Sequence, residues 1–256
     1  KTTVAIDATS AATISGTGAE LSTALGSTGI NTGAAVALTA SGSVSTSQQA
    51  TLDGTTTGVI TATLSDGDLA TLAGIADANG NNALTITVTD TSVSALALKN
   101  LADKTTVTVT ATAATSVSGT GAQIIDMYDN ASITFSTSEN VTVSDTIRSN
   151  AAASIAGNTS GNVTATVASA CAASLATDLG ASTGAFTLTV TGAASATNLN
   201  TLDGVTSVTV DASGATALSG TTANVLTLLS ADVTLPTDIP ITLTNTPSVA
   251  NANTID

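Results

Sequence analysis

The stretch that decides the fold is KTTVAIDATSAATISGTGAEL, residues 1–21, because the chain repeats it. It returns as KTTVTVTATAATSVSGTGAQI at residues 104–124 and as VTSVTVDASGATALSGTTANV at residues 205–225. Self-similarity at a fixed period is the sequence signature of a repeat architecture. The period of roughly 102 residues exceeds the roughly 20–50 residues of one structural repeat, so each period has to contain several.

Short segments in which apolar residues alternate with threonine recur along the whole chain. They centre on Val4, Val36, Val59, Ile86, Val107, Val141, Val163, Leu188, Val208 and Leu243. Apolar side chains at every second position predict strands with one buried face. The intervals of roughly 20–35 residues predict four coils in each period and about ten in the chain.

Each predicted coil combines a strand with a short helix. In LTITVTD, residues 84–90, the apolar side chains point to one face and the threonines to the other. Groups such as SDGD (65–68) and SGTG (15–18) are typical of helix starts, and LATLAGI (69–75) has apolar residues one helical turn apart. We therefore expect an α/β fold, a right-handed strand–short-helix solenoid with one parallel sheet. An all-β solenoid is the alternative, because the helical stretches are short and rich in threonine.

The repeats also set the expected domain organisation. We expect a single solenoid segment over residues 1–256, with internal repeats at 1–103, 104–204 and, in part, 205–256. The last residues, NANTID, correspond to the ends of earlier coils such as NTLDG (200–204). The sequence thus reads as a segment cut in phase from a longer array, which continues covalently or by end-to-end assembly.

Composition excludes several classes of function. The net charge is −14 with four basic residues, whereas nucleic-acid binding needs clustered Lys and Arg. Thr, Ser or Gly interrupts every apolar stretch, so we expect no membrane span. The chain has no histidine and no cluster that pairs a nucleophile with a base, so we expect no enzyme activity, no catalytic residue and no cofactor-binding residue. Few cysteines and few lysines suit an extracellular bacterial protein.

Aspartates recur at corresponding positions of the coils. One set lies at the ends of strands and comprises Asp7, Asp90, Asp145 and Asp211. The other set lies at the ends of coils and comprises Asp53, Asp103 and Asp203. Stacked carboxylates would supply the oxygen ligands that calcium takes, and the alternative is that they cap helices and form turns. The EF-hand loop and the nonapeptide calcium repeat are both absent, so the metal ligands stay unknown.

The threonine face of the predicted sheet is the most unusual surface. Thr166, Thr187 and Thr189 belong to strands that we expect to be neighbours. Flat threonine ladders resemble the ice-binding faces of antifreeze solenoids, whereas threonine also simply favours solvated strands. We expect four alanines to interrupt the ladder: Ala5, Ala37, Ala62 and Ala165.

Three further features carry a functional and a structural interpretation. The SGTG loops lack the residues of a phosphate-binding P-loop, which favours a structural turn. Cys171 is alone, and we expect it to be a small buried residue on a helix face. Four sequons are candidates for glycosylation: Asn130, Asn140, Asn158 and Asn162.

The phrases TLSDGDLATLAG (63–74), ALTITVTDTSVSA (83–95) and LNTLDG (199–204) carry a resemblance over the whole chain. The sequence resembles the very long repetitive cell-surface proteins of marine cyanobacteria. That resemblance implies an exported, calcium-associated surface protein with a role in motility, adhesion or envelope structure. Unlike the calcium-repeat members, this chain has no glycine–aspartate nonapeptides, and no functional residue carries over.

Three functions are consistent with this sequence. We expect a structural repeat segment of an extracellular rod, fibre or filament, which associates with itself end to end. The alternative is an adhesin or binding module whose threonine face meets a glycan, another cell or a mineral. Ice binding is the third.

Overall fold

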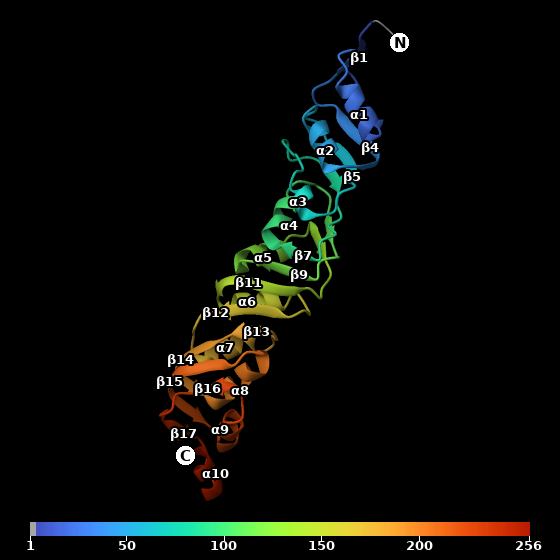
Figure 1. Cartoon of the computed structure of the whole chain (residues 1–256). Coiled ribbons are helices and arrows are strands. Elements are labelled where there is room, and N and C mark those ends of the chain that lie inside the picture. The colour runs from blue at the N-terminus through green and yellow to red at the C-terminus, as the bar shows by residue number, and fades with distance from the viewer. Residues whose placement is uncertain (1–3) are drawn as a thin grey trace. The chain divides into compact units, whose positions relative to one another are not determined.

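The computed structural model describes residues 4–256, in which short parallel strands alternate with short helices (Figure 1). The helices are α1 (Gly18–Leu25), α2 (Thr46–Asp53), α3 (Leu69–Leu72), α4 (Ala95–Ala102), α5 (Gly121–Tyr128), α6 (Ser149–Ala156), α7 (Ala172–Leu179), α8 (Ala196–Val205), α9 (Thr222–Leu228) and α10 (Val249–Ile255). The α/β class is therefore confirmed. The all-β alternative is wrong for this part of the chain, because a helix follows each strand segment.

One or two strands precede each helix, and we call each such strand-and-helix group a layer. The strands are β1 (Ile6–Ala8), β2 (Thr13–Gly16), β3 (Ile30–Thr32), β4 (Ala37–Val44), β5 (Ile60–Leu64), β6 (Ala83–Thr85), β7 (Ser92–Ser94), β8 (Val109–Ala111), β9 (Ser116–Gly119), β10 (Ile133–Phe135), β11 (Asn140–Ile147), β12 (Val163–Val167), β13 (Ala185–Thr187), β14 (Thr189–Ser195), β15 (Val210–Gly220), β16 (Val233–Thr234) and β17 (Ile241–Leu243). Val4, predicted to centre a strand, lies before β1 and is 73% exposed.

The chain divides into two compact units. Unit 1 comprises Lys1–Thr115 and Asp126–Ser136, and unit 2 comprises Ser116–Ile125 and Thr137–Asp256. The three sequence repeats and the single segment over 1–256 stay predictions.

The strand pairs within each unit are parallel. In unit 1, β1 pairs with β3, β8 pairs with β10, and one sheet has the order β2-β4-β5-β6. In unit 2, the orders are β9-β11-β12-β13 and β14-β15-β16, and β17 also pairs with β15. The expectation of one parallel sheet is wrong, because the strands are divided among several separate parallel sheets. The Asp7 carboxylate accepts hydrogen bonds from Thr9, and this turn separates β1 from β2.

The core of each unit lies between the helices and one face of the strands. In β5, Ile60, Ala62 and Leu64 are buried, while the threonines between them are exposed. Leu52 of α2 and Leu72 of α3 are fully buried. Burial of such a side chain stabilises the fold by about 1.5–3 kcal/mol. The core is therefore built from many aliphatic side chains in a sequence that is only 1% aromatic.

Polar side chains cap most of the helices, as the sequence predicts, whereas α6 and α7 begin without a side-chain cap. Thr17 caps α1 and forms a capping box with Glu20, and Ser45 does the same for α2 with Gln48. Thr221 of the third repeat caps α9. These side chains satisfy backbone N–H groups that a helix leaves unpaired. The SGTG loops are thus helix starts in the described chain.

The repeated motif Thr-(Thr/Ser) has a structural role that the sequence did not predict. The Thr105 hydroxyl donates to the Leu84 carbonyl at 2.8 Å and accepts from the Leu84 N–H at 2.8 Å and the Val107 N–H at 3.1 Å. It therefore joins its own turn to the preceding layer. The same contact to the carbonyl of the preceding layer recurs at Thr56, Thr159 and Thr206. We call these four residues the threonine clamps.

Candidate functional site

The exposed face of the sheet in unit 1 carries two rows of hydroxyl groups. Strand register places Ser15, Thr39, Thr61 and Ala83 in one row, and Ser43, Thr63 and Thr85 in the other. The hydroxyl-bearing residues of both rows are exposed. Adjacent strands lie about 4.8 Å apart, so each row is a regular ladder of alcohol groups. We call this surface, with its counterpart in unit 2, the hydroxyl face.

Unit 2 repeats this arrangement with nearly the same residues. One row is Ser118, Thr142, Thr164 and Ala185, and the other is Thr146, Thr166 and Thr187. Thr166 and Thr187 are direct partners, as predicted. Thr189 is not in this row, because it belongs to β14 and pairs with Asp211.

Two of the four alanines expected to interrupt the ladder do not lie on this face. Ala62 and Ala165 are buried among the apolar side chains of β5 and β12. Each stands two residues from a buried neighbour, and alternation along a strand places it on the core side. Ala37 is half-buried and pairs with Thr13, and Ala5 is exposed just before β1.

The strand-end aspartates accept hydrogen bonds from the backbone. Asp7 and Asp211 each accept from the N–H and hydroxyl of the residue two positions later. Asp90 accepts from the Leu69 N–H at 2.8 Å, and Asp145 accepts from the Gly121 N–H at 2.7 Å. The latter two carboxylates thus cap the helix of the preceding layer.

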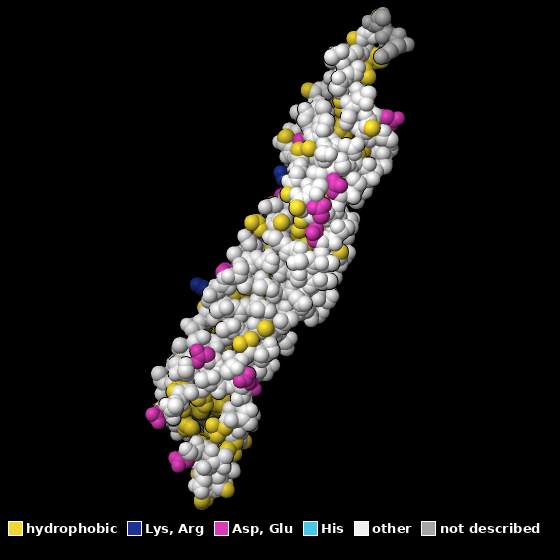
Figure 2. Space-filling model, in the orientation of Figure 1, with side chains coloured by type: hydrophobic (Ala, Val, Ile, Leu, Met, Phe, Trp, Pro, Cys, Tyr) yellow, Lys and Arg dark blue, Asp and Glu magenta, His cyan; other side chains and the backbone are white. Residues whose placement is uncertain are grey.

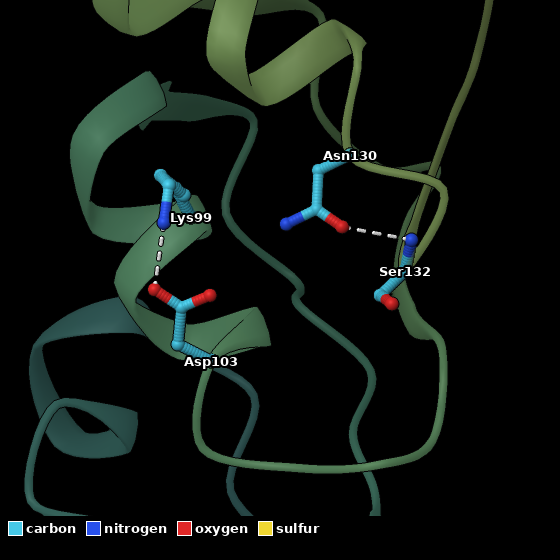
Figure 3. A network of polar contacts seen from close by, with 4 residues as sticks. All are labelled: Lys99, Asp103, Asn130 and Ser132. Carbon is cyan, nitrogen blue, oxygen red and sulfur yellow. Dashed lines mark hydrogen bonds and ion pairs between the residues drawn. The ribbon is translucent and has the colours of Figure 1, made fainter.

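The coil-end aspartates also have protein partners. Asp53 accepts from the Asn82 amide at 2.8 Å, and Asp203 accepts from the Asp232 N–H at 2.8 Å. Asp103 forms an ion pair with Lys99 at 2.8 Å on the surface of α4 (Figure 3). Within residues 4–256, no group of three or more Asp, Glu, Cys or His lies together as metal ligands would.

Hydrogen bonds shift the pKa of several exposed carboxyl groups in one direction. The Thr9 hydroxyl and N–H lower the pKa of Asp7, and the Ser213 hydroxyl and N–H lower the pKa of Asp211. The Thr71 N–H lowers the pKa of Asp68, the N-cap of α3. The hydrogen bonds favour the charged form, so these carboxyl groups stay ionised to a lower pH than usual.

The four sequons lie in different local settings. Asn130 accepts from the Ser132 N–H at 2.9 Å in a turn of unit 1 (Figure 3). Asn140 accepts from the Asn162 N–H at 2.9 Å, so these two sequons face each other on neighbouring strands. Asn158 donates to the Ser154 carbonyl at the end of α6. Glycosylation at these positions stays a prediction.

Cys171 is not where the sequence placed it. It is exposed and occupies the N-cap of α7, without a side-chain capping bond. The prediction of a buried residue is wrong, because the thiol stands before the helix and not on its apolar face. The buried small residue is the next one, Ala172.

An apolar groove of 560 Å³ lies at one end of unit 2. Its apolar lining includes Leu229, Leu235, Ile241, Leu243 and Ile255, and Asp238 and Asp256 also line it. Figure 2 shows hydrophobic atoms gathered in a hollow over this part of the unit, near α9, β17 and α10 in Figure 1. Ile241 and Ile255 are half-buried, whereas Leu38 and Leu52, at the corresponding positions of unit 1, are fully buried.

No family model, curated protein or solved structure matches this chain. Its candidate site therefore rests on its own geometry. Among residues 4–256, no helix is both long enough and apolar enough to cross a lipid bilayer. The described surfaces suited to contact are the hydroxyl face, which offers hydrogen bonds, and the apolar groove, which offers apolar area.

Proposed function

We propose that the chain is a structural repeat segment of an extracellular surface rod, fibre or filament, and that it has no enzyme activity. In this proposal the layers form a right-handed solenoid of about ten coils. The strand–helix alternation supports it, because stacked layers bury a core that no single layer buries alone. The extracellular location follows from the composition and from the family resemblance.

The observation that carries the proposal is the recurrence of the hydroxyl rows. The rows that begin at Ser15 and Ser43 in unit 1 return at Ser118 and Thr146 in unit 2, 103 positions later. The two sets share both strand register and chemistry. A chain selected for one reaction has no need to duplicate its surface, whereas a structural element gains length from each added repeat.

A second copy of the chain is the occupant that we propose for the apolar groove. The strand pairs are parallel, so a copy that arrives head to tail continues the same strand direction. In unit 1, the exposed apolar residues Val4 and Ile6 are candidates for the complementary surface of that copy. Such a contact is heterologous and generates an open filament, not a closed dimer.

Electron microscopy of the chain at increasing concentration tests this proposal. We expect continuous filaments whose length grows with concentration. Separate particles of constant size at every concentration would contradict end-to-end assembly. The same preparation should show no hydrolase or transferase activity, and turnover of a substrate would contradict the non-enzymatic assignment.

A binding module is the alternative, and the exposed hydroxyl rows favour it. Regular alcohol groups can hydrogen-bond a glycan or an ordered mineral surface. A glycan array with the native chain and with Thr63→Val and Thr166→Val tests this function. Binding that both substitutions abolish would support the alternative, and thermal hysteresis that they abolish would instead indicate ice binding.

A further inference from the structure

We propose that Asn79–Gly80 is a site of spontaneous modification, at which the folded protein converts an asparagine into aspartate and isoaspartate. Asn79 is the only asparagine in the sequence that precedes a glycine. The pair lies exposed in the loop between α3 and β6. Gly80 has φ +66°, and apart from Gly80 and its two chain neighbours no residue has an atom within 4 Å of the position that a Cβ would take. The site therefore has both the residue pair and the open space that the reaction needs.

Hydrogen bonds hold this loop on both sides of the Asn79–Gly80 pair but not at the pair itself. Before the pair, the Ala76 N–H donates to the Gln49 side chain at 3.0 Å. After it, the Asn82 amide donates to Asp53 at 2.8 Å. Within the described chain, neither the Asn79 side chain nor the Gly80 N–H makes a hydrogen bond. Both reacting groups are thus free to approach each other.

The reaction needs only water and mild base. The Gly80 nitrogen loses its proton and attacks the Asn79 side-chain carbonyl carbon, which forms a five-membered ring and releases ammonia. Water then opens this succinimide at either carbonyl. One opening gives aspartate, and the other gives isoaspartate, in which the main chain runs through the former side chain. Glycine permits ring closure because it has no Cβ and adopts many backbone conformations.

Two other sites in the chain show why the structure favours Asn79. Asn158 donates to the Ser154 carbonyl at 2.9 Å and precedes threonine. Asp66 precedes Gly67, but its carboxylate accepts the Thr46 N–H at 2.7 Å. These side chains are held in hydrogen bonds, whereas Asn79 is not. The product at residue 79 is a carboxylate two positions from Asp77, in a chain that already carries a net charge of −14.

Incubation of the full folded chain in mildly alkaline buffer, followed by peptide mass spectrometry, tests the proposal. We expect the mass gain of amide-to-acid conversion to appear at Asn79 before it appears at any other asparagine, because only Asn79 precedes a residue with the backbone freedom of glycine. Methyl labelling by an isoaspartyl methyltransferase should mark the same peptide. Mildly acidic buffer should slow the conversion.

The Asn79→Gln variant is the matched control. Glutamine keeps the amide but forms the corresponding ring less readily, and residue 79 makes no hydrogen bond that the change would break. Circular dichroism should be unchanged, and labelling of this peptide should be lost. Conversion that is equal at Asn79 and Asn158, or that occurs only in urea-unfolded chain, would overturn the proposal.

Discussion

At the scale of single residues, the threonines of this chain differ in role although they look alike in the sequence. Thr105 is buried and clamps two layers, whereas Thr85 is exposed on the hydroxyl face. Thr105→Val leaves the Leu84 N–H and carbonyl buried without this partner. A buried unpaired polar group costs about 1–3 kcal/mol, so we expect the free energy of unfolding to fall by about 2 kcal/mol. Urea denaturation followed by circular dichroism measures it.

Thr85→Val is the control for this prediction, because it makes the same chemical change on the solvent side. We expect its effect to stay within about 0.5 kcal/mol. Equal losses in both variants would contradict the clamp. The sequence alone did not separate the two roles, since alternation places Thr85 but says nothing of a turn residue that bonds to a strand 21 positions earlier. The recurrence of Thr-(Thr/Ser) shortly after the helix of a layer is the sequence signal that could have indicated the clamps.

The lowered pKa of Asp68 sets the direction of a pH effect. The Thr71 N–H, and then its side chain, stabilise the ionised form, so the folded pKa lies below the ordinary value of 3.8. A depressed folded pKa contributes stability above the unfolded pKa, and this contribution is lost as the pH falls through the folded pKa. We expect an NMR titration to place the Asp68 midpoint lower in the folded chain than in urea. Equal midpoints would contradict the prediction.

At the scale of the elements, α2 is an example of a helix capped twice, by its own layer and by the next. Ser45 caps α2 from within, and Asp66 of the following layer accepts the Thr46 N–H at 2.7 Å. Loss of a cap costs about 1 kcal/mol. We therefore expect Asp66→Ala to lower the free energy of unfolding by about that amount. Faster amide hydrogen exchange at Thr46 should accompany the loss.

Asp66→Asn is the matched variant, because the chain already uses an asparagine in this role. Asn245 accepts the Thr222 N–H at 2.7 Å before α9. We expect Asp66→Asn to keep most of the stability, since a side-chain amide oxygen can accept the same bond. A loss as large as that of the alanine variant would show that charge, and not the hydrogen bond, carries the effect.

The helix starts and the apolar strand faces could be predicted, because both depend on residues close in sequence. Thr17 of the SGTG group and Asp68 of the SDGD group cap α1 and α3 as predicted, and Leu84, Ile86 and Val88 are buried together. Partners 20 or more positions apart could not be predicted in the same way. The single-sheet expectation failed for this reason, since the division of the strands among several sheets depends on pairings between distant residues. The register shift between Thr39 and Ser43 likewise appears only when β4 and β5 pair.

At the scale of the whole molecule, the repeat could be recognised in the sequence, whereas the surfaces could be predicted only in part. The recurrence of residues 1–21 predicts layers, and alternation predicts an outer threonine face. The alternation rule also assigns Ala62 and Ala165 to the core, where they lie, so that error was avoidable. The apolar groove joins Leu229, just after α9, with the loop 235–239, β17 and α10, and no local pattern contains it.

Charge and the apolar groove together predict how end-to-end assembly depends on salt. Copies with a net charge of −14 repel one another at low ionic strength, and the screening length falls to about 10 Å at 0.1 M salt. Contact through the groove buries apolar area, which salt does not weaken by screening. We therefore expect light scattering to show longer assemblies as salt is added. Assembly that salt dissolves would indicate that ion pairs, and not the groove, hold the copies together.

The matched pair Ile241→Asp and Val249→Asp separates the groove from general surface charge. Ile241 lines the groove, whereas Val249 lies on α10, is 79% exposed and is not part of the lining. Both variants add one negative charge to nearby elements of unit 2. We expect Ile241→Asp to abolish assembly at every salt concentration, because a carboxylate in the contact is costly to desolvate. Val249→Asp should only shift assembly to higher salt, and equal loss in both variants with unchanged circular dichroism would contradict the groove as the contact.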